Sequence, residues 1–389
     1  MRPSGKKHTS TRRLLTALVV CGMSTVVLPG AASAKILWSG DYESGDFRQW
    51  HKTSGNEPNF SQMPDYCRPT GYAEGGDGTC LSLSTSIKRQ GKYAAKFTVK
   101  NAANGSEPAD CDTAGTKCDR RRAELTGQII HPDRYNALPY MSERWISVSH
   151  YVPADWAPVS SSGWGSITVF QIKPRNENGL SPTFAINLTG NAWRIEHRWD
   201  DAANPSTSQV PWQQQMFYDN VYPAANGSDS GADLRSDFPN QSVSQKALGS
   251  INKGGWTDWV IHVKFDARGK AAGGTGFLEV WKRENQGDWI KVLNIRPKKI
   301  SRGGMTFDHG IGYNSPATSG NNGGFGIKAG LYMHKADAWN LSSPRTIYND
   351  NIRIGDASTK FEEISPDGSA PGQSAQIAPP SPPVLFDIR

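Results

Sequence analysis

The chain has 389 residues, of which 36% are hydrophobic and 10% aromatic, with 43 lysines and arginines against 36 acidic residues. Five of the basic residues and none of the acidic ones lie within positions 1–34, so the remainder has a net charge of 38 minus 36, or +2. A charge this small gives no reason to expect a nucleic-acid partner.

The first 34 residues have the three parts of a secretory signal peptide. A basic segment from Arg2 to Arg13 precedes the apolar run LLTALVVCGMSTVVL, and the small-residue stretch GAASA follows. This order predicts cleavage after Ala34 and a secreted, extracellular protein. No other run is long and apolar enough to cross a bilayer, so we expect no membrane association.

The cysteines predict two disulfides. Cys21 would leave with the signal peptide, and the other four are even in number and destined for an oxidising compartment. Three connectivities are open, and pairing between sequence neighbours is our working choice among them. The absence of a C-x-x-C spacing argues against a zinc site. The four cysteines are Cys67, Cys80, Cys111 and Cys118.

Residues 35–364 have the pattern of a single all-β domain. Short strand-like runs alternate with Gly, Asn, Asp and Pro, and no segment keeps a helical period, which favours a β-sandwich. Residues 365–389 are rich in Pro, Ser and Gly, and we expect a disordered tail there. The clearest predicted strands are 93–100, 144–153, 166–173, 183–189, 258–265, 276–282, 326–333 and 349–355.

Three of these segments carry polar residues on one face. Because side chains alternate along a strand, RAELT at 122–126 places Arg122, Glu124 and Thr126 together. In the same way QIK at 171–173 groups Gln171 with Lys173. The run KAGLY at 328–332 puts Lys328 and Tyr332 on one face with Gly330 between them.

If these faces line one groove, their chemistry suits a polymer of uronic acids. Arginine and glutamine can bind the sugar carboxylate, and neutralising that carboxylate makes the C5 proton easier to remove. A tyrosine can move protons at C5 and at the leaving oxygen. Gly330 would let a sugar ring approach the strand backbone.

Each feature also has a purely structural interpretation. Arg122 with Glu124 is equally well explained as an exposed ion pair, and Tyr332 alone as a packing residue with a hydrated hydroxyl. Three histidines in strand patterns, His150, His197 and His262, are best explained as structural. Only the occurrence of the three polar strands in one chain favours a functional site.

The motifs resemble those of the β-jelly-roll polysaccharide lyases, the family that contains heparin lyase I and glucuronan lyase and shares a groove plan with jelly-roll alginate lyases. RAEL is similar to that family's R-S-E-L strand, FQIK to its Q-x-H strand and IKAGLY to its K-x-G-x-Y strand. WTDWVIHVKFD with GFLEVWKR, and then YNDNIRIGD, resemble its later strands in the same order. The resemblance covers about residues 35–357 and implies a concanavalin-like β-jelly-roll.

The resemblance also implies roles for individual residues. Tyr332 corresponds to the catalytic tyrosine, Lys328 to the basic residue beside it, Gln171 to the carboxylate-binding amide and Arg122 to the groove arginine. Further residues of the same faces, which we expect to bind substrate, are Lys173, Glu124 and His334.

One departure from the family pattern concerns the proton base. Lys173 stands where these lyases commonly have a histidine, and a lysine of ordinary pKa is protonated near neutrality. Either a tyrosine serves as both base and acid, or a histidine enters the groove from elsewhere, with His131, His150 and His334 as candidates; otherwise Lys173 simply binds a carboxylate. Thr126 occupies the position of a second arginine found in the alginate enzymes, which weakens an alginate assignment.

The sequence therefore predicts a secreted, monomeric polysaccharide lyase that cleaves an acidic polysaccharide by β-elimination. A glucuronan-like polymer is favoured, followed by alginate or heparin-like chains. The alternative is a non-catalytic, lectin-like jelly roll, and a glycoside hydrolase ranks third because its carboxylate signature is absent. We expect no required cofactor and no catalytic metal. The sequence is compatible with a structural calcium ion.

Overall fold

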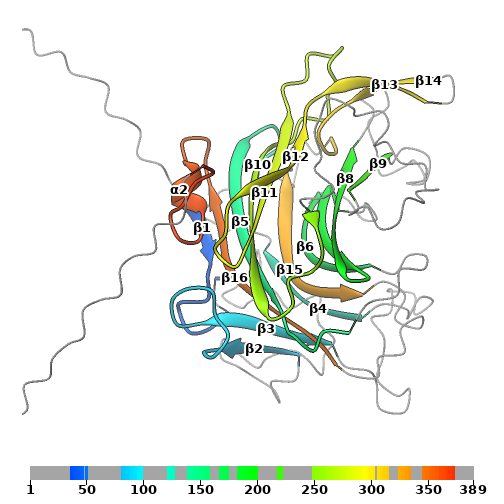
Figure 1. Ribbon diagram of the computed structural model, residues 1–389. Coiled ribbons are helices and arrows are strands. Elements are labelled where there is room, and N and C mark those ends of the chain that lie inside the picture. Colours follow the sequence, from blue (N-terminus) through cyan, green and yellow to red (C-terminus); the bar gives the residue numbers. More distant parts are fainter. Residues whose placement is uncertain are drawn as a thin grey trace, which may run out of the picture. The chain divides into compact units, whose positions relative to one another are not determined.

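A computed structural model describes residues 36–47, 49–50, 80–99, 121–127, 138–157, 166–174, 182–199, 217–221, 248–302, 305–314, 323–333 and 344–372. These residues belong to one compact unit, Ala34–Arg389. They form two antiparallel sheets that lie against each other as layers (Figure 1). The fold is a β-jelly-roll sandwich, which confirms the predicted fold class.

The first layer is an eight-stranded sheet. Its order is β12-β11-β10-β5-β16-β3-β2, and β1 pairs with β16 beside this path. The strands are β1 (Ile36–Gly40), β2 (Leu81–Ser84), β3 (Ala94–Val99), β5 (Glu143–Val152), β10 (Gly255–Lys264), β11 (Phe277–Glu284), β12 (Ile290–Ile295) and β16 (Arg345–Gly355).

The second layer is a six-stranded sheet with the order β4-β15-β6-β7-β8-β9. A separate two-stranded ribbon, β13 (Lys298–Arg302) with β14 (Met305–His309), projects beside the sandwich (Figure 1). The strands of the six-stranded sheet are β4 (Arg121–Gly127), β6 (Ile167–Pro174), β7 (Phe184–Thr189), β8 (Ala192–Trp199), β9 (Phe217–Val221) and β15 (Phe325–Met333).

The hydrophobic core lies between the two sheets because each strand turns its apolar residues inward. Trp193 of β8 meets Trp259 of β10 edge to face, with ring centroids 5.3 Å apart, and both indoles are fully buried. On β15 the alternating residues Ile327, Ala329 and Leu331 are likewise fully buried. The opposite, outer face of the six-stranded sheet is therefore the face that carries the polar residues of β4, β6 and β15.

Each of the eight strand-like runs named from the sequence overlaps a strand of the structure. Short strands such as β1 and β2 were not predicted, and neither was β8. Along β8 the inward residues Trp193, Ile195 and Trp199 alternate with charged ones, so a period-two signal was present in AWRIEHRW.

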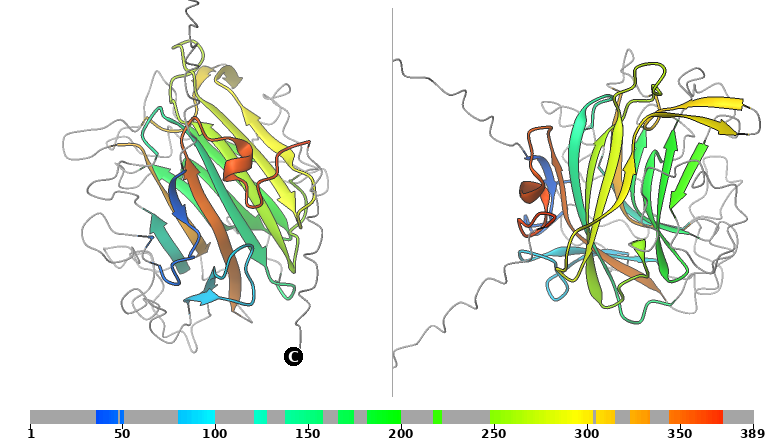
Figure 2. Two further views of the ribbon diagram at one scale, coloured as in Figure 1. Left: turned by 90° about the vertical axis from the view of Figure 1, so that its left-hand side faces the viewer. Right: turned by 45° about the horizontal axis from the view of Figure 1, so that its top comes forward.

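The predicted tail boundary at Ser365 does not coincide with the end of packing. The short helix α2 (Phe361–Ile364) lies over β16 and β5 on the outer face of the eight-stranded sheet (Figure 2). The residues that follow it reach Arg283 of β11 and Trp289. Phe361 and Ile364 join Trp281 and Trp289 in a small apolar cluster. Residues 373–389 are outside the described part of the chain.

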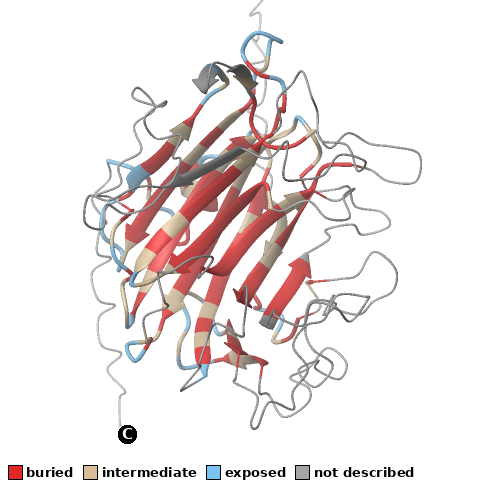
Figure 3. Cartoon of the chain, turned by 90° about the vertical axis from the view of Figure 1, so that its right-hand side faces the viewer, coloured by how far each residue is buried: buried red, intermediate tan, exposed pale blue. Residues whose placement is uncertain are grey.

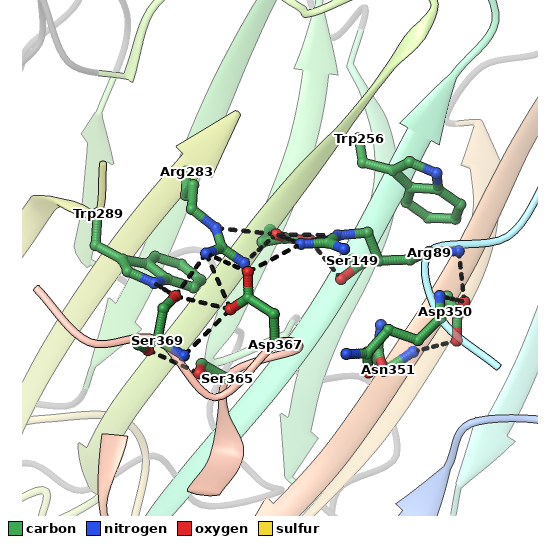
Figure 4. A network of polar contacts seen from close by, with 12 residues as sticks. Arg89, Ser149, Trp256, Arg283, Trp289, Asp350, Asn351, Ser365, Asp367 and Ser369 are labelled. Carbon is green, nitrogen blue, oxygen red and sulfur yellow. Dashed lines mark hydrogen bonds and ion pairs between the residues drawn. The ribbon is translucent and has the colours of Figure 1, made fainter. Parts of the chain in front are cut away.

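A polar network fastens this C-terminal segment to the sheet (Figure 4). The guanidinium of Arg283 donates to both oxygens of Asp367, at 2.9 and 3.0 Å, and to Ser369 Oγ at 2.6 Å. Trp289 Nε1 also donates to Ser369 Oγ, at 3.0 Å. Residues that composition assigns to a tail are thus held by specific hydrogen bonds.

Candidate functional site

Two rows of side chains cross the outer face of the six-stranded sheet. Residues directly opposite each other in an antiparallel pair lie on the same face. The first row runs from Thr126 on β4 through Lys328 on β15 and Gln171 on β6 to Ala185 on β7 and Glu196 on β8. The structure therefore brings Lys328 and Gln171, predicted from separate motifs, into direct register.

The second row contains the predicted catalytic tyrosine. Tyr332 pairs with Arg122 on one side and with Thr168 on the other, and the row continues to Asn187 and Arg194. A register shift of β15 against β6 falls between Ala329 and Tyr332, so the two rows are separated by a bulge. Arg122 is placed here by its backbone register, and its side chain lies outside the described part.

Burial distinguishes the side chains of these rows. Gln171 is 2% exposed, Tyr332 6% exposed and Glu124 fully buried, whereas Lys173 and Lys328 are half-buried. In a view onto this side of the molecule, most of the sheet's strands are coloured as buried (Figure 3). Polar groups withdrawn from water to this extent need partners, and their electrostatic interactions are strengthened by the low local dielectric.

Glu124 and Gln171 form such a pair. The amide Nε2 of Gln171 donates to Glu124 Oε1 at 2.5 Å, although the two residues belong to strands on opposite sides of β15. The other carboxylate oxygen, Glu124 Oε2, has no hydrogen-bond partner within the described structure. The sequence placed both residues in the site without indicating that they touch.

Gly330 has a different role from the one expected from the sequence. Its φ of +135° lies in the region that favours glycine, and a Cβ there would come within 2.1 Å of the Ala123 carbonyl oxygen and 2.9 Å of Phe97 Cδ1. The glycine thus lets β15 approach β4 and the core closely. The expected approach of a sugar ring to this backbone is not what requires the glycine.

β8 adds charged residues that the sequence interpretation missed. Glu196 lies between Arg194 and Arg198, with carboxylate-to-guanidinium distances of 2.6 and 2.5 Å. On the neighbouring strand, Thr168 Oγ1 donates to Asn187 Oδ1 at 2.7 Å. The outer face consequently carries arginines and amides well beyond the predicted residues, along a line that crosses the strands.

Three histidines, His150, His197 and His262, lie away from this face. His150 is 1% exposed between the sheets, with its ring 5.8 Å from that of Trp193, and burial lowers its pKa to about 3. His197 is buried and accepts a hydrogen bond from the Gly312 backbone. His262 stacks on Trp145, with ring centroids 3.8 Å apart, on the eight-stranded sheet. His150 is therefore excluded as a base that enters the site.

Several predicted residues fall outside the described part of the chain. His131 and His334 are among them, as are Cys67, Cys111 and Cys118. Cys80 is buried at the start of β2. The histidine candidates and both disulfides accordingly stay predictions.

The described residues hold no group of three or more His, Cys, Asp or Glu side chains that could bind a metal ion. Within the same residues, no helix is long and apolar enough to span a membrane. What the site offers chemically is a set of cations and amides that can bind anions, beside a phenol that can transfer a proton.

Comparison with known proteins identifies the family to which this chain belongs. The family model described as polysaccharide lyase matches residues 42–353, which contain every strand from β2 to β15. A comparison with curated protein sequences finds no match. This protein belongs to the polysaccharide lyase family, as the motif resemblance predicted, and is an enzyme of that class.

Several solved protein structures are distantly similar to this chain. An endo-β-1,4-glucuronan lyase from Trichoderma reesei is 15% identical, with 74% of this chain and 90% of that one covered and a TM-score of 0.44. A GH131 β-glucanase catalytic domain from Podospora anserina is 14% identical, with coverages of 84% and 98% and a TM-score of 0.41. An alginate lyase from Klebsiella pneumoniae is 10% identical, with coverages of 75% and 87% and a TM-score of 0.38.

Proposed function

We propose that this polysaccharide lyase is secreted and cleaves a uronic-acid polymer by β-elimination on the outer face of its six-stranded sheet. The observation that carries the proposal is the register that sets Lys328 beside Gln171, with Tyr332 further along the same strand. A cation and an amide at adjacent positions suit a sugar carboxylate, and a phenol nearby suits the proton transfers.

In the proposed reaction the polymer's carboxylate lies against Gln171 and Lys328. The positive charge of Lys328 and the hydrogen bonds of both residues stabilise the negative charge that develops on the carboxylate when a base removes the C5 proton. The electron pair then forms the C4–C5 double bond while the C4–O bond breaks. Tyr332 gives its proton to the leaving glycosidic oxygen, and one new chain carries an unsaturated sugar at its end.

Tyr332 is also our proposed base. His150 lies in the core, and a protonated lysine at 173 is a poor proton acceptor. Starting as the phenolate, Tyr332 takes the C5 proton and then passes it, as the phenol, to the leaving oxygen if both lie on the same side of the sugar ring. A free tyrosine has a pKa of about 10, so this role needs nearby cations such as Lys328 to favour the phenolate. Lys173 then contributes charge to carboxylate binding.

Glucuronan or a related glucuronate polymer is the favoured substrate, ahead of alginate and heparin-like chains. This order is supported by Thr126, which is paired with Lys328 in the first row and provides a hydroxyl where an arginine would provide a second positive charge for the carboxylate. We further propose that the enzyme acts as a monomer and needs no cofactor.

The test is to incubate the secreted enzyme with glucuronan, alginate and heparin-like chains, with and without a chelator. Ultraviolet absorbance of the unsaturated sugar reports elimination, and hydrolysis does not produce it. We expect the signal with glucuronan and no loss in chelator. Binding without any absorbance from these polymers would favour the lectin-like alternative, whereas new reducing ends without absorbance would indicate a hydrolase.

A further inference from the structure

The contact between Glu124 and Gln171 spans a whole strand. Neighbouring strands lie about 4.8 Å apart, so the strands β4 and β6 on either side of β15 are about 9.6 Å apart. The two side chains nevertheless meet at 2.5 Å. The residue of β15 paired with Glu124 is Gly330, which lets β15 lie close to β4.

The chemistry of the pair determines which end of the amide faces the carboxylate. An ionised carboxylate only accepts hydrogen bonds, so the NH₂ end of Gln171 must point to Glu124. The reverse orientation would place two acceptor oxygens at contact distance. One N–H of Gln171 is thereby engaged, while the second N–H and the carbonyl Oε1 have directions set by Glu124.

Glu124 differs from the residues proposed to bind substrate because its side chain is fully buried and its Oε1 is already engaged by the Gln171 amide. Burying a carboxylate costs free energy unless it is compensated, and well-packed apolar residues usually serve a fold at least as well. One hydrogen bond to a glutamine, with Oε2 unpartnered among the described residues, is poor compensation. The fold alone therefore gives little reason for a glutamate at this position.

We propose that Glu124 is a positioning residue: it holds the Gln171 amide in the one orientation that presents an N–H to the sugar carboxylate. The inference rests on the proposed function, in which Gln171 binds that carboxylate, and adds a residue that acts only through Gln171. Glu124 was expected from the sequence to bind substrate directly, and the two roles make different predictions.

The experiment is a double-mutant cycle with Glu124→Gln and Gln171→Ala, measured as kcat and KM on the polymer that the parent cleaves best. A glutamine at 124 keeps the size of the side chain but accepts either end of the amide. We expect Glu124→Gln alone to lower kcat/KM by about 10–100-fold, by analogy with the loss of residues that orient metal ligands. The double variant should be no worse than Gln171→Ala alone, because the orienting residue then has nothing to orient.

Glu279→Gln is the matched control, since Glu279 is a carboxylate of the eight-stranded sheet that accepts hydrogen bonds from Lys291 and Arg296. In a double variant with Gln171→Ala, the fold-change in kcat/KM caused by Glu279→Gln should be the same as in the parent enzyme. The positioning role would be overturned if the double variant lost kcat/KM by the product of the two single-variant losses. It would also be overturned if Glu124→Gln alone had parental kinetics. Thermal unfolding of each variant separates these results from misfolding. A parent without lyase activity would instead overturn the proposed function, and this inference with it.

Discussion

Arg283 lies against Asp258 on the outer face of the eight-stranded sheet, with its Nη2 2.8 Å from the carboxylate and both side chains 1% exposed. The Asp258 carboxylate also accepts from Arg89, at 2.9 Å, and from Ser149 Oγ, at 2.7 Å. Arg283 in turn holds Asp367. One buried carboxylate thus joins the central strands β10, β5 and β11 to a loop and, through Arg283, to the C-terminal segment (Figure 4).

We expect Asp258→Ala to lower the free energy of unfolding by about 3–5 kcal/mol, because it leaves the buried charge of Arg283 without its main partner. Urea denaturation measures the change. Asp288→Ala is the control: that carboxylate is exposed in the turn between β11 and β12, and its loss should change the free energy of unfolding by less than about 0.5 kcal/mol. Equal effects of the two substitutions would contradict the structural role assigned to Asp258.

Truncation tests the docking of the C-terminal segment. A chain that ends after Ile364 loses Asp367 and Ser369, and with them charged hydrogen bonds to Arg283. We expect its free energy of unfolding to fall by about 2–3 kcal/mol. A chain that ends after Gly372 keeps these bonds and should match the parent. If both truncations unfold like the parent, the segment adds no stability.

The stability of the fold should fall in acid through His150. Its pKa of about 3 in the folded state lies below the ordinary value of 6.5. The lowered pKa contributes stability that is present above pH 6.5 and is lost as the pH falls toward the folded value. From pH 6.5 to 4 the expected loss is roughly 3 kcal/mol, from about 1.4 kcal/mol per pH unit.

His150→Leu removes this titration, so its unfolding free energy should depend less on pH across the same interval. Chemical denaturation at several pH values compares the two proteins, and the difference between their slopes is what isolates His150 from other acidic groups. Parallel pH curves for the parent and the variant would show that His150 does not govern the acid response.

Removal of one hydroxyl tests the assignment of Tyr332. Tyr332→Phe keeps the buried ring and should leave the unfolding temperature unchanged, but lower kcat by about 10²–10⁴-fold through loss of proton transfer. Tyr151→Phe, on the eight-stranded sheet next to Trp256, is a control that should retain parental turnover. A Tyr332→Phe enzyme with nearly parental kcat would make this tyrosine a packing residue.

The exported protein should contain no free thiol. Four cysteines follow residue 34, and two disulfides would consume all of them. Thiol titration of the denatured, unreduced protein should therefore detect none, and prior reduction should reveal four. Two or more reactive thiols before reduction would mean that at least one disulfide does not form.

The strands and the polar face of β15 could be predicted from the sequence because side-chain alternation is a local property of a strand. Family motifs supported the jelly roll and the individual site residues for the same reason, since each motif lies within one strand. β8 shows the limit of such predictions. Its side chains alternate as regularly, but the sequence near β8 does not indicate that Arg194 and Glu196 lie on the same sheet face as Gln171. That depends on the pairing of β7 with β8 and of β6 with β7.

Relations between strands distant in the sequence were decided only by the tertiary structure. Glu124 and Gln171 are 47 positions apart, and they meet because β15, from much later in the chain, pairs between their strands. Composition alone suggested a loose tail beyond Ser365, yet Asp367 and Ser369 are held by Arg283 of β11. A local pattern determines which residues share a face, whereas register and strand order determine which of them touch.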